Sequence, residues 1–285
     1  MRQRTSGGQS DEMWPQVFKI GPVPVNSYGL LIVIGFLLAL YVGRRETLRR
    51  GLPDRFSDMS MAMLISGIVG GRIYYYFQFY ESSFSHKSFL AILYIWEGGL
   101  VFYGGAIGGL LGGLGFLLWK RLPVAAYLDV ASLVAPIGMA AGRLGCFLNG
   151  CCYGRRCSAE YLLGVKFPEG SAAAHQHEEL GLIAAGQQAL PVHPVQLYQS
   201  VHDFLLFFLM VLFHRRVSAP LGAGMPMLFV FYAIGRFVLE GLRGDHQVTW
   251  SGLTTSQNIS VGLFALFVPL LGLLFLREWR RAGRP

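Results

Sequence analysis

The stretch "IGPVPVNSYGLLIVIGFLLALYVG", residues 20–43, decides the fold class because it carries no charged side chain. A helix of roughly 20 apolar residues crosses the hydrocarbon core of a bilayer, and this stretch is long enough. Similar uncharged runs cover 98–119 and 247–276, while 59–80 contains only Arg72. Charged residues make up 14% of the 285-residue chain, against about 25% in soluble domains. The sequence therefore predicts an all-α, polytopic integral membrane protein.

Apolar runs and the polar residues between them predict about seven transmembrane helices. These predicted spans are 27–43, 59–80, 98–119, 127–148, 194–213, 223–242 and 259–276. The polar segment 150–192 lies between the fourth and fifth spans and is expected to form a small extracytoplasmic head. The whole chain, 1–285, is interpreted as a single membrane domain that carries this head as an insertion.

Basic residues predict the orientation, because lysine and arginine concentrate on the cytoplasmic side of a membrane protein. They gather after the first, third, fifth and seventh spans, as Arg44, Arg45, Arg49, Arg50, Arg55, Lys120, Arg121, Arg215, Arg216, Arg277, Arg280, Arg281 and Arg284. The C-terminus is therefore expected in the cytoplasm and the N-terminus outside. Residues 1–19 are polar, so no cleavable signal peptide is expected. The net charge of +8 reflects this topology, and no soluble basic face suggests nucleic-acid binding.

The third predicted span contains "GGAIGGLLGGLG", residues 104–115. Glycines four residues apart let two helix backbones approach closely in a membrane. A phosphate-binding loop would need a soluble strand-to-helix turn, which this segment does not offer. The pattern favours close helix packing.

Three arginines lie inside predicted spans, where each costs roughly 2.5–3.5 kcal/mol on insertion scales. They are Arg72, Arg143 and Arg236. Arg236 and Glu240 lie four residues apart, between Tyr232 and Arg243 on one helical stripe, so the purely structural interpretation is that these two pair with each other. Asp203, beside His202, is expected to pair with an arginine.

The acidic residues near these arginines are too few and too scattered to neutralise all of them. They are Glu240, Asp203, Asp129 and the more superficial Glu97. A surplus of buried positive charge predicts an anionic ligand, and guanidinium groups suit phosphate. In a membrane, the abundant phosphate anion is a lipid head group.

Six motifs in this order resemble the prolipoprotein diacylglyceryl transferase family of bacterial inner membranes, over nearly the whole chain. They are "IGPVPVNSYGL" (20–30), "GGRIYYYF" (70–77), "WEGGLVFYGGAIGG" (96–109), "GRLGCFLNGCCYG" (142–154), "HPVQLY" (193–198) and "YAIGRFVLEGLRGD" (232–245).

This resemblance implies a reaction and its partners. Such an enzyme moves the diacylglyceryl group of phosphatidylglycerol to the thiol of a lipobox cysteine in a prolipoprotein, and glycerol phosphate leaves. The reaction starts lipoprotein maturation at the bacterial cytoplasmic membrane and requires no metal or organic cofactor. Fixed cations would stabilise the charge that grows on the departing phosphate.

The resemblance also implies site residues. Arg143 and Arg236 match the phosphate-binding pair, and with Glu240 and Tyr103 they form the expected catalytic set. The expected substrate-binding residues are Tyr28, Arg72, Asn149, Gly154, His193, Tyr232 and Arg243.

The chain departs from the family pattern at several of these motifs. Tyr103 stands where many members have a histidine that has been proposed as the base, and a phenol with a pKa of about 10 is a poor base at neutral pH. We therefore expect Tyr103 to position substrate, and either another group deprotonates the thiol or the arginines lower the thiol pKa. Cys146 and Cys151 replace the common asparagine and glutamate, and Gln199 stands where a glutamate is frequent.

The four cysteines, Cys146, Cys151, Cys152 and Cys157, admit three interpretations. They could be buried apolar thiols, a disulfide facing an oxidising exterior, or a zinc site, whose spacing would be unusual. The first two are favoured, and none is expected to act as a nucleophile because the reacting thiol belongs to the substrate.

A transporter or lipid-binding protein on the same scaffold is the alternative function, since charges inside spans also mark transport pathways. The chain shows no internal repeat of the kind that many transporters have.

Overall fold

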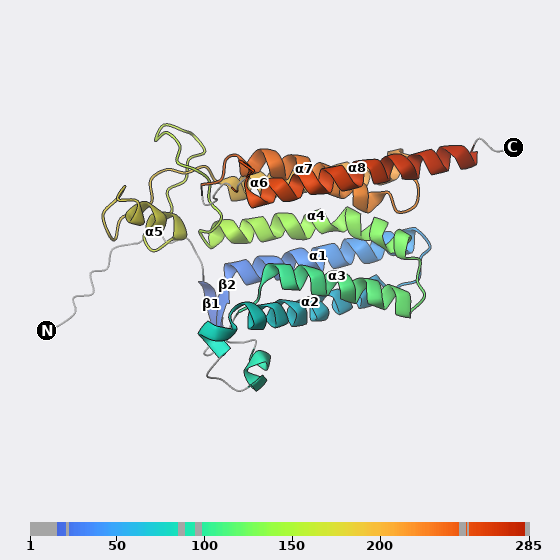
Figure 1. Cartoon of the computed structure of the whole chain (residues 1–285), viewed down its shortest axis with the longest axis horizontal. Helices are drawn as coiled ribbons and strands as arrows, with labels where there is room; N and C mark the ends of the chain where they lie inside the picture. The colour runs from blue at the N-terminus through green and yellow to red at the C-terminus, as the bar shows by residue number, and fades with distance from the viewer. Residues whose placement is uncertain are drawn as a thin grey trace. The chain divides into compact units, whose positions relative to one another are not determined.

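The computed structural model describes residues 16–20, 23–84, 89–94, 99–244, 249 and 251–282 (Figure 1). Glu97 and the N-terminal residues 1–15, for which the sequence made predictions, lie outside the described residues. Contacts divide the chain into two compact units, and each is described by itself. The first unit comprises Met1–Ala39 with Ala131–Pro285, and the second comprises Leu40–Val130.

The first unit contains the head and the helices next to it in the sequence. Its elements are β1 (Gln16–Ile20), β2 (Val23–Asn26), the first half of α1 (Ser27–Arg49), most of α4 (Val124–Leu148), α5 (Ala172–Glu179), α6 (Val195–Arg216), α7 (Gly224–Glu240) and α8 (Thr255–Ala282). Strands β1 and β2 pair antiparallel. The all-α prediction did not include this short hairpin.

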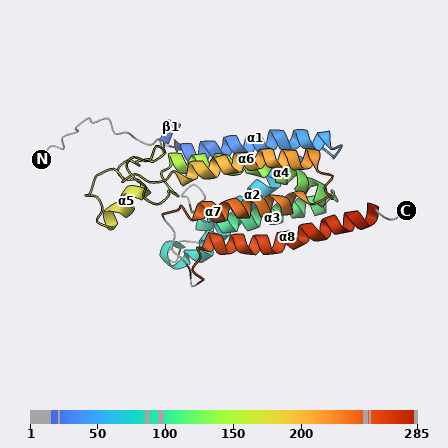
Figure 2. The same cartoon turned by 90° about the horizontal axis from the view of Figure 1, so that it is seen from above.

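Helices α4, α6 and α7 are tied together by apolar and polar contacts. Leu206 and Met210 of α6 pack with Leu228 of α7 in one buried cluster. The Ser200 hydroxyl of α6 donates a 3.0 Å hydrogen bond to the carbonyl of Ala140 in α4. Helix α8 lies along α7 (Figures 1 and 2), where the rings of Phe229 and Phe267 stack with centroids 4.8 Å apart. These contacts fix the three helices that carry the candidate site.

The predicted head folds as a small structure around α5, beyond the ends of α4 and α6 (Figures 1 and 2). Its own core consists of Tyr153, Phe167, Ala173, Ala174, Ala189 and Val192. Ser171 caps α5, because its side chain accepts a 3.2 Å hydrogen bond from the Ala174 backbone N–H. The Tyr153 hydroxyl donates to Gln176 at 2.6 Å, which ties the helix to the loop after α4. The head therefore has an apolar core of its own.

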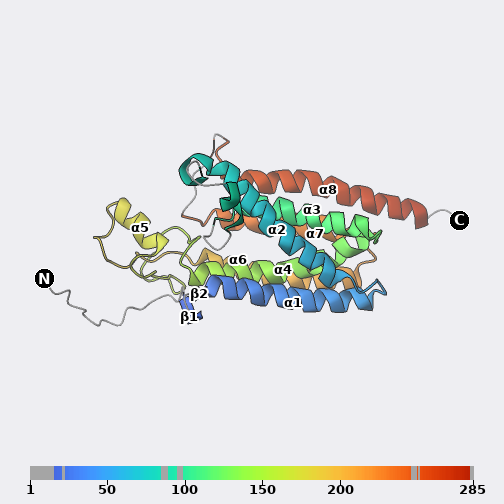
Figure 3. The ribbon, with the colours of Figure 1, turned by 90° about the horizontal axis from the view of Figure 1, so that it is seen from below.

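The second unit contains α2 (Phe56–Gln78), the short helices η1 (Tyr80–Phe84) and η2 (Phe89–Leu93), and α3 (Phe102–Trp119). Helices α2 and α3 run side by side (Figure 3). A Cβ atom added to Gly70, Gly104 or Gly108 would collide with the backbone of the partner helix. The interpretation of the glycine-rich span as a close-packing surface is confirmed.

Each of the seven predicted spans coincides with a long helix of the structure. Five of these helices, α1, α3, α4, α6 and α8, are long and apolar enough to cross a membrane. The chain is therefore a polytopic membrane protein. Helix α7 has 17 residues, about 26 Å at a rise of 1.5 Å per residue, and falls short of the usual hydrocarbon thickness. That α2 and α7 also cross the bilayer stays a prediction.

Candidate active site

A small pocket between α4, α6 and α7 of the first unit collects several of the predicted residues. It is lined by Arg143, Gln199, His202, Asp203, Tyr232, Arg236 and Leu239. Two arginines that are far apart in the sequence thus reach one pocket. Tyr232 joins them because it lies one helical turn before Arg236 on α7.

Arg236 and Glu240 form an ion pair within α7, as the structural interpretation of these charges has it. Nη2 of Arg236 lies 2.8 Å from Oε2 of Glu240, whose side chain is completely buried. The Thr254 hydroxyl donates to the other carboxylate oxygen at 3.1 Å, and Nε of Arg243 lies 3.8 Å from Oε2. Nη2 of Arg236 also donates to the Ser256 hydroxyl at 2.9 Å. Glu240 therefore holds Arg236 in a fixed orientation.

Arg143 differs from Arg236 because it has no carboxylate partner among the described residues. It is partly buried near the C-terminal end of α4 and interacts electrostatically with Arg236 and with the Cys152 thiol. Among the described residues, Arg236 is thus paired directly with a carboxylate, whereas Arg143 is not.

Two further polar groups in this pocket have no hydrogen-bond partner among the described residues. They are Nη1 of Arg236 and both side-chain amide atoms of Gln199, which is 3% exposed. Buried polar groups nearly always have a hydrogen-bond partner, and leaving a buried donor or acceptor without one costs about 1–3 kcal/mol. Nη1 of Arg236 can donate to an anion, and the Gln199 amide can donate to and accept from hydroxyl groups. A ligand that carries both would therefore satisfy these groups.

Asp203 lines the same pocket, but the prediction that it pairs with an arginine is wrong. Its Oδ1 lies 3.0 Å from Nδ1 of His202, the preceding residue of α6. The imidazole packs over Gly235 of α7, where any side chain would collide with it. A carboxylate bonded to one ring nitrogen fixes the orientation of the imidazole. The sequence placed His202 beside Asp203, but it did not show that both face the arginines.

The loop after α4 brings three cysteines together. The backbone N–H of Gly150 donates to the Phe147 carbonyl, and that of Cys151 donates to the Cys146 carbonyl, both at 3.1 Å. This is the Schellman ending of a helix, and Gly150 has the positive φ of 69° that it needs. The motif folds Cys151 back over Cys146.

The next residue, Cys152, continues this turn. It has a φ of 64°, which is uncommon for a residue with a side chain. The sulfur atoms of Cys146, Cys151 and Cys152 all lie within 4.8 Å of one another, and all four cysteines of the chain are free. Cys157 lies elsewhere, against Gly164. The disulfide interpretation therefore has no support in the structure, while the geometry admits a metal ion.

Two predicted residues flank this cysteine cluster. Tyr28, at the start of α1, packs against Gly145 and interacts electrostatically with the three thiols and with Arg143. Asn149 is exposed at the end of α4, and its side chain interacts electrostatically with the Cys151 thiol. Both residues therefore lie at the end of α4 that carries Arg143.

Gly154, His193 and Arg243 also meet, through backbone pairing. Gly154 forms an antiparallel bridge with Arg243, and its N–H donates to the His193 carbonyl at 2.9 Å. A Cβ atom at position 154 would collide with that carbonyl and with Val195. Glycine is thus required where three chain segments converge. Nδ1 of His193 lies 3.4 Å from the hydroxyl of Tyr198.

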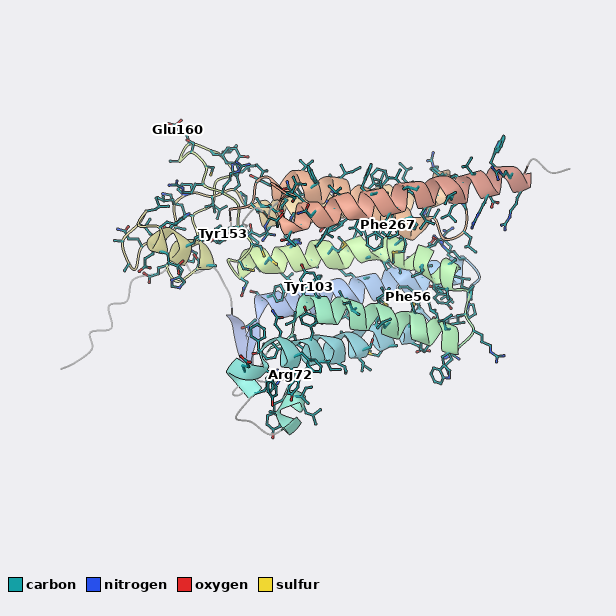
Figure 4. All side chains as sticks on the ribbon, viewed as in Figure 1. Phe56, Arg72, Tyr103, Tyr153, Glu160 and Phe267 are labelled. Carbon is teal, nitrogen blue, oxygen red and sulfur yellow. The ribbon has the colours of Figure 1, made fainter. Side chains whose placement is uncertain are left out.

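Arg72 and Tyr103 belong to the second unit (Figure 4). The guanidinium of Arg72 donates to the backbone carbonyls of Ala91, Ile92, Tyr94 and Gly99, at 2.8–3.2 Å. These contacts indicate that Arg72 fastens the segment between α2 and α3, and its role as a substrate ligand stays a prediction. Tyr103 is 54% exposed at the first turn of α3, and its ring contacts that of Phe102.

Comparison with known proteins matches residues 15–273 to the family model of prolipoprotein diacylglyceryl transferases. A phosphatidylglycerol–prolipoprotein diacylglyceryl transferase of Lysinibacillus sphaericus is 34% identical over 87% of this chain and 87% of that relative. Relatives of the same name from Halalkalibacterium halodurans and Burkholderia mallei are 33% and 32% identical. They cover 93% and 94% of this chain, and 85% and 96% of their own lengths. The chain therefore belongs to the prolipoprotein diacylglyceryl transferase family.

Proposed function

We propose that this protein transfers the diacylglyceryl group of phosphatidylglycerol to the thiol of a lipobox cysteine in a prolipoprotein, releasing glycerol phosphate. The observation that carries this proposal is the pocket in which Arg143, which has no carboxylate partner among the described residues, lies with the buried pair of Arg236 and Glu240. Such a pocket selects an anion, and two guanidinium groups can grip a phosphodiester by several hydrogen bonds.

The reaction displaces a phosphate from an sp³ carbon, so negative charge grows on the departing oxygen. Arg143 and Arg236 stabilise that charge, and they are held in place before the reaction begins. Glu240 keeps Arg236 aimed at the phosphate through their 2.8 Å contact. Tyr232 lies on the same wall of the pocket. These residues form the binding site for the phosphate.

Gln199 is the candidate ligand for the glycerol of the lipid head group. Its buried amide offers both a donor and an acceptor, and neither has a partner among the described residues. A head group with hydroxyls satisfies both. Gln199→Leu, which keeps the size and removes the polar atoms, should therefore raise the KM for phosphatidylglycerol more than it lowers kcat.

His202 is the candidate proton acceptor for the attacking thiol. Its imidazole lies in the arginine pocket and is oriented by the 3.0 Å contact with Asp203. An imidazole is a better proton acceptor for a thiol at neutral pH than the phenol of Tyr103 is. Tyr103 then positions substrate. Tyr28, Asn149, Gly154, His193 and Arg243 form the mouth of the site on the side of the head.

The remaining assignments concern the membrane. We place the protein in the bacterial cytoplasmic membrane with seven spans, the head and N-terminus outside, and the C-terminus in the cytoplasm. The arginines in the last turns of α6 and α8 support this orientation. Prolipoproteins present their lipobox at the outer surface in this arrangement.

The proposal is tested by head-group release. Purified protein in detergent is mixed with phosphatidylglycerol and a lipobox peptide, and glycerol phosphate is measured. Release that requires the cysteine peptide, and that fails with a peptide carrying serine instead, supports transfer. Release at the same rate without peptide indicates a lipase, and no release by folded protein favours the lipid-binding or transport alternative.

A further inference from the structure

Three thiols at the end of α4 form a cluster that the proposed reaction leaves unused. The sulfur atoms of Cys146, Cys151 and Cys152 lie within 4.8 Å of one another, and all three side chains are partly buried. We propose that these thiols bind a zinc ion whose fourth ligand is the thiol of the prolipoprotein. This inference rests on the proposed function, because it names the group that activates the substrate thiol.

The geometry is close to what zinc requires. A tetrahedral zinc–thiolate site has bonds of about 2.3 Å, which place neighbouring sulfur atoms about 3.8 Å apart. The three sulfurs need to approach by at most about 1 Å, which side-chain rotation supplies. Zinc with three protein ligands and one open position is the usual arrangement of a catalytic site. Cys157 is not part of the cluster in the described structure, so the fourth position is available.

The backbone holds the cluster in place independently of a metal ion. The Schellman ending of α4 fixes Cys151 over Cys146. The carbonyl of Cys151 accepts a 2.7 Å hydrogen bond from the completely buried Gln196 of α6. Cys152 keeps a positive φ of 64°, which turns its thiol toward the other two. Such preorganisation is what a metal site needs, since ligands that are already placed lose little freedom on binding.

Charge balance also favours zinc at this position. Three thiolates and Zn²⁺ carry a net charge of −1, and the guanidinium groups of Arg143 and Arg243 interact electrostatically with Cys152. Arg143 also lines the phosphate pocket. The same arginine therefore joins the cluster to the pocket, so a thiol bound at the metal lies beside the bound phosphodiester.

The chemistry balances without a redox step. The substrate thiol loses its proton when it binds zinc, because a coordinated thiol is deprotonated, and His202, the proposed acceptor, takes up that proton. Its sulfur attacks the sp³ carbon of the diacylglyceryl group, and the S–C bond forms as the C–O bond to phosphate breaks. The electron pair leaves with the phosphate oxygen, and glycerol phosphate departs from the arginines.

The test begins with metal content. The full-length protein is purified in detergent without chelator, and zinc is measured by mass spectrometry alongside a thiol count under denaturing conditions. We expect about one zinc per chain, as the single cluster implies. Cys146→Ser, Cys151→Ser and Cys152→Ser should each lose the metal. The matched control Cys157→Ser, outside the cluster, should keep it.

A second measurement detects whether the substrate thiol binds at the open coordination position of the metal. Cobalt is exchanged for zinc, and its visible spectrum is recorded while a lipobox peptide is added. The proposal predicts a change in the cobalt bands with the cysteine peptide and none with the serine peptide. If a serine variant does not fold, the spectrum of the wild-type cobalt protein still decides.

Two results overturn the inference. One is metal-free protein, with either four free thiols or a disulfide between two cluster cysteines. The other is equal loss of metal in Cys157→Ser. Diacylglyceryl transfer by the metal-free protein overturns the zinc role and leaves the proposed function standing. Metal and peptide binding without any transfer overturns the proposed function and leaves the metal site.

Discussion

Removal of the two pocket arginines should affect the stability of the protein differently, because only Arg236 is paired with a carboxylate. Arg143 has no carboxylate partner among the described residues, so Arg143→Ala removes a costly buried charge and leaves none stranded. The stability of the Arg143→Ala variant should therefore be close to that of the wild type. Arg236→Ala leaves the fully buried Glu240 without its 2.8 Å partner. Losing one partner of a buried ion pair costs about 3–5 kcal/mol, and we expect the lower end because Glu240 keeps Thr254 and a distant Arg243.

Activity should fall steeply in both variants. A fixed donor that stabilises the charge of a transition state contributes about 100- to 1000-fold to the rate. Arg143→Lys separates charge from geometry, because lysine keeps the charge and lacks the planar fork that grips phosphate. We expect it to lose most activity and to keep its melting temperature.

The assay measures diacylglyceryl transfer and thermal unfolding of all three variants in one detergent. Full activity in Arg143→Lys would remove the phosphate-gripping role of Arg143. A large loss of stability in Arg143→Ala would show that this arginine has a carboxylate partner after all. Equal stability of Arg236→Ala and wild type would contradict the assigned importance of the ion pair.

Further predictions concern the group that accepts the thiol proton and the stability of the head. Gly235→Ala should displace the packed imidazole of His202 and lower kcat, while Gly138→Ala, where a Cβ meets open space, should not; equal effects would refute the role of His202. Tyr103→Phe should keep much activity, and a pH–rate profile that loses its basic limb in this variant would identify Tyr103 as a base instead. Burial lowers the pKa of His177 in the head, so unfolding takes up a proton and the head should lose stability as the pH falls below about 6.5. Amide hydrogen exchange of residues 150–192 measures this, and an unchanged pH dependence in His177→Gln would contradict it.

The sequence predicted the helices of this protein well because apolar length is a strong local signal. The uncharged run at 20–43 contains most of α1, and the glycine spacing at 104–113 predicted a close-packing surface on α3, although it did not identify α2 as the partner. Arg236 and Glu240 were recognised as a pair because four residues make one helical turn. The short hairpin β1–β2 was missed because its second strand lies within that apolar run and has no pattern of its own.

The rest of the site depends on contacts between distant segments, which local patterns do not encode. Asp203 was expected to find an arginine, yet its nearest partner is the neighbouring His202. Nothing in the sequence shows that Thr254 reaches the carboxylate of Glu240 from the start of the last helix. The cysteine cluster was visible as a spacing, but its closure depends on the positive φ of Gly150 and Cys152.

The central claim is that the arginine pocket catalyses alkylation of a substrate thiol by a phospholipid. Its most direct test is the mass of a lipobox peptide after incubation with the purified protein and phosphatidylglycerol. The account predicts that the cysteine, and no other residue, gains one diacylglyceryl group, and that Arg143→Ala abolishes this gain while remaining folded. A peptide of unchanged mass after incubation with folded wild-type protein, or an equal gain with Arg143→Ala, would contradict it.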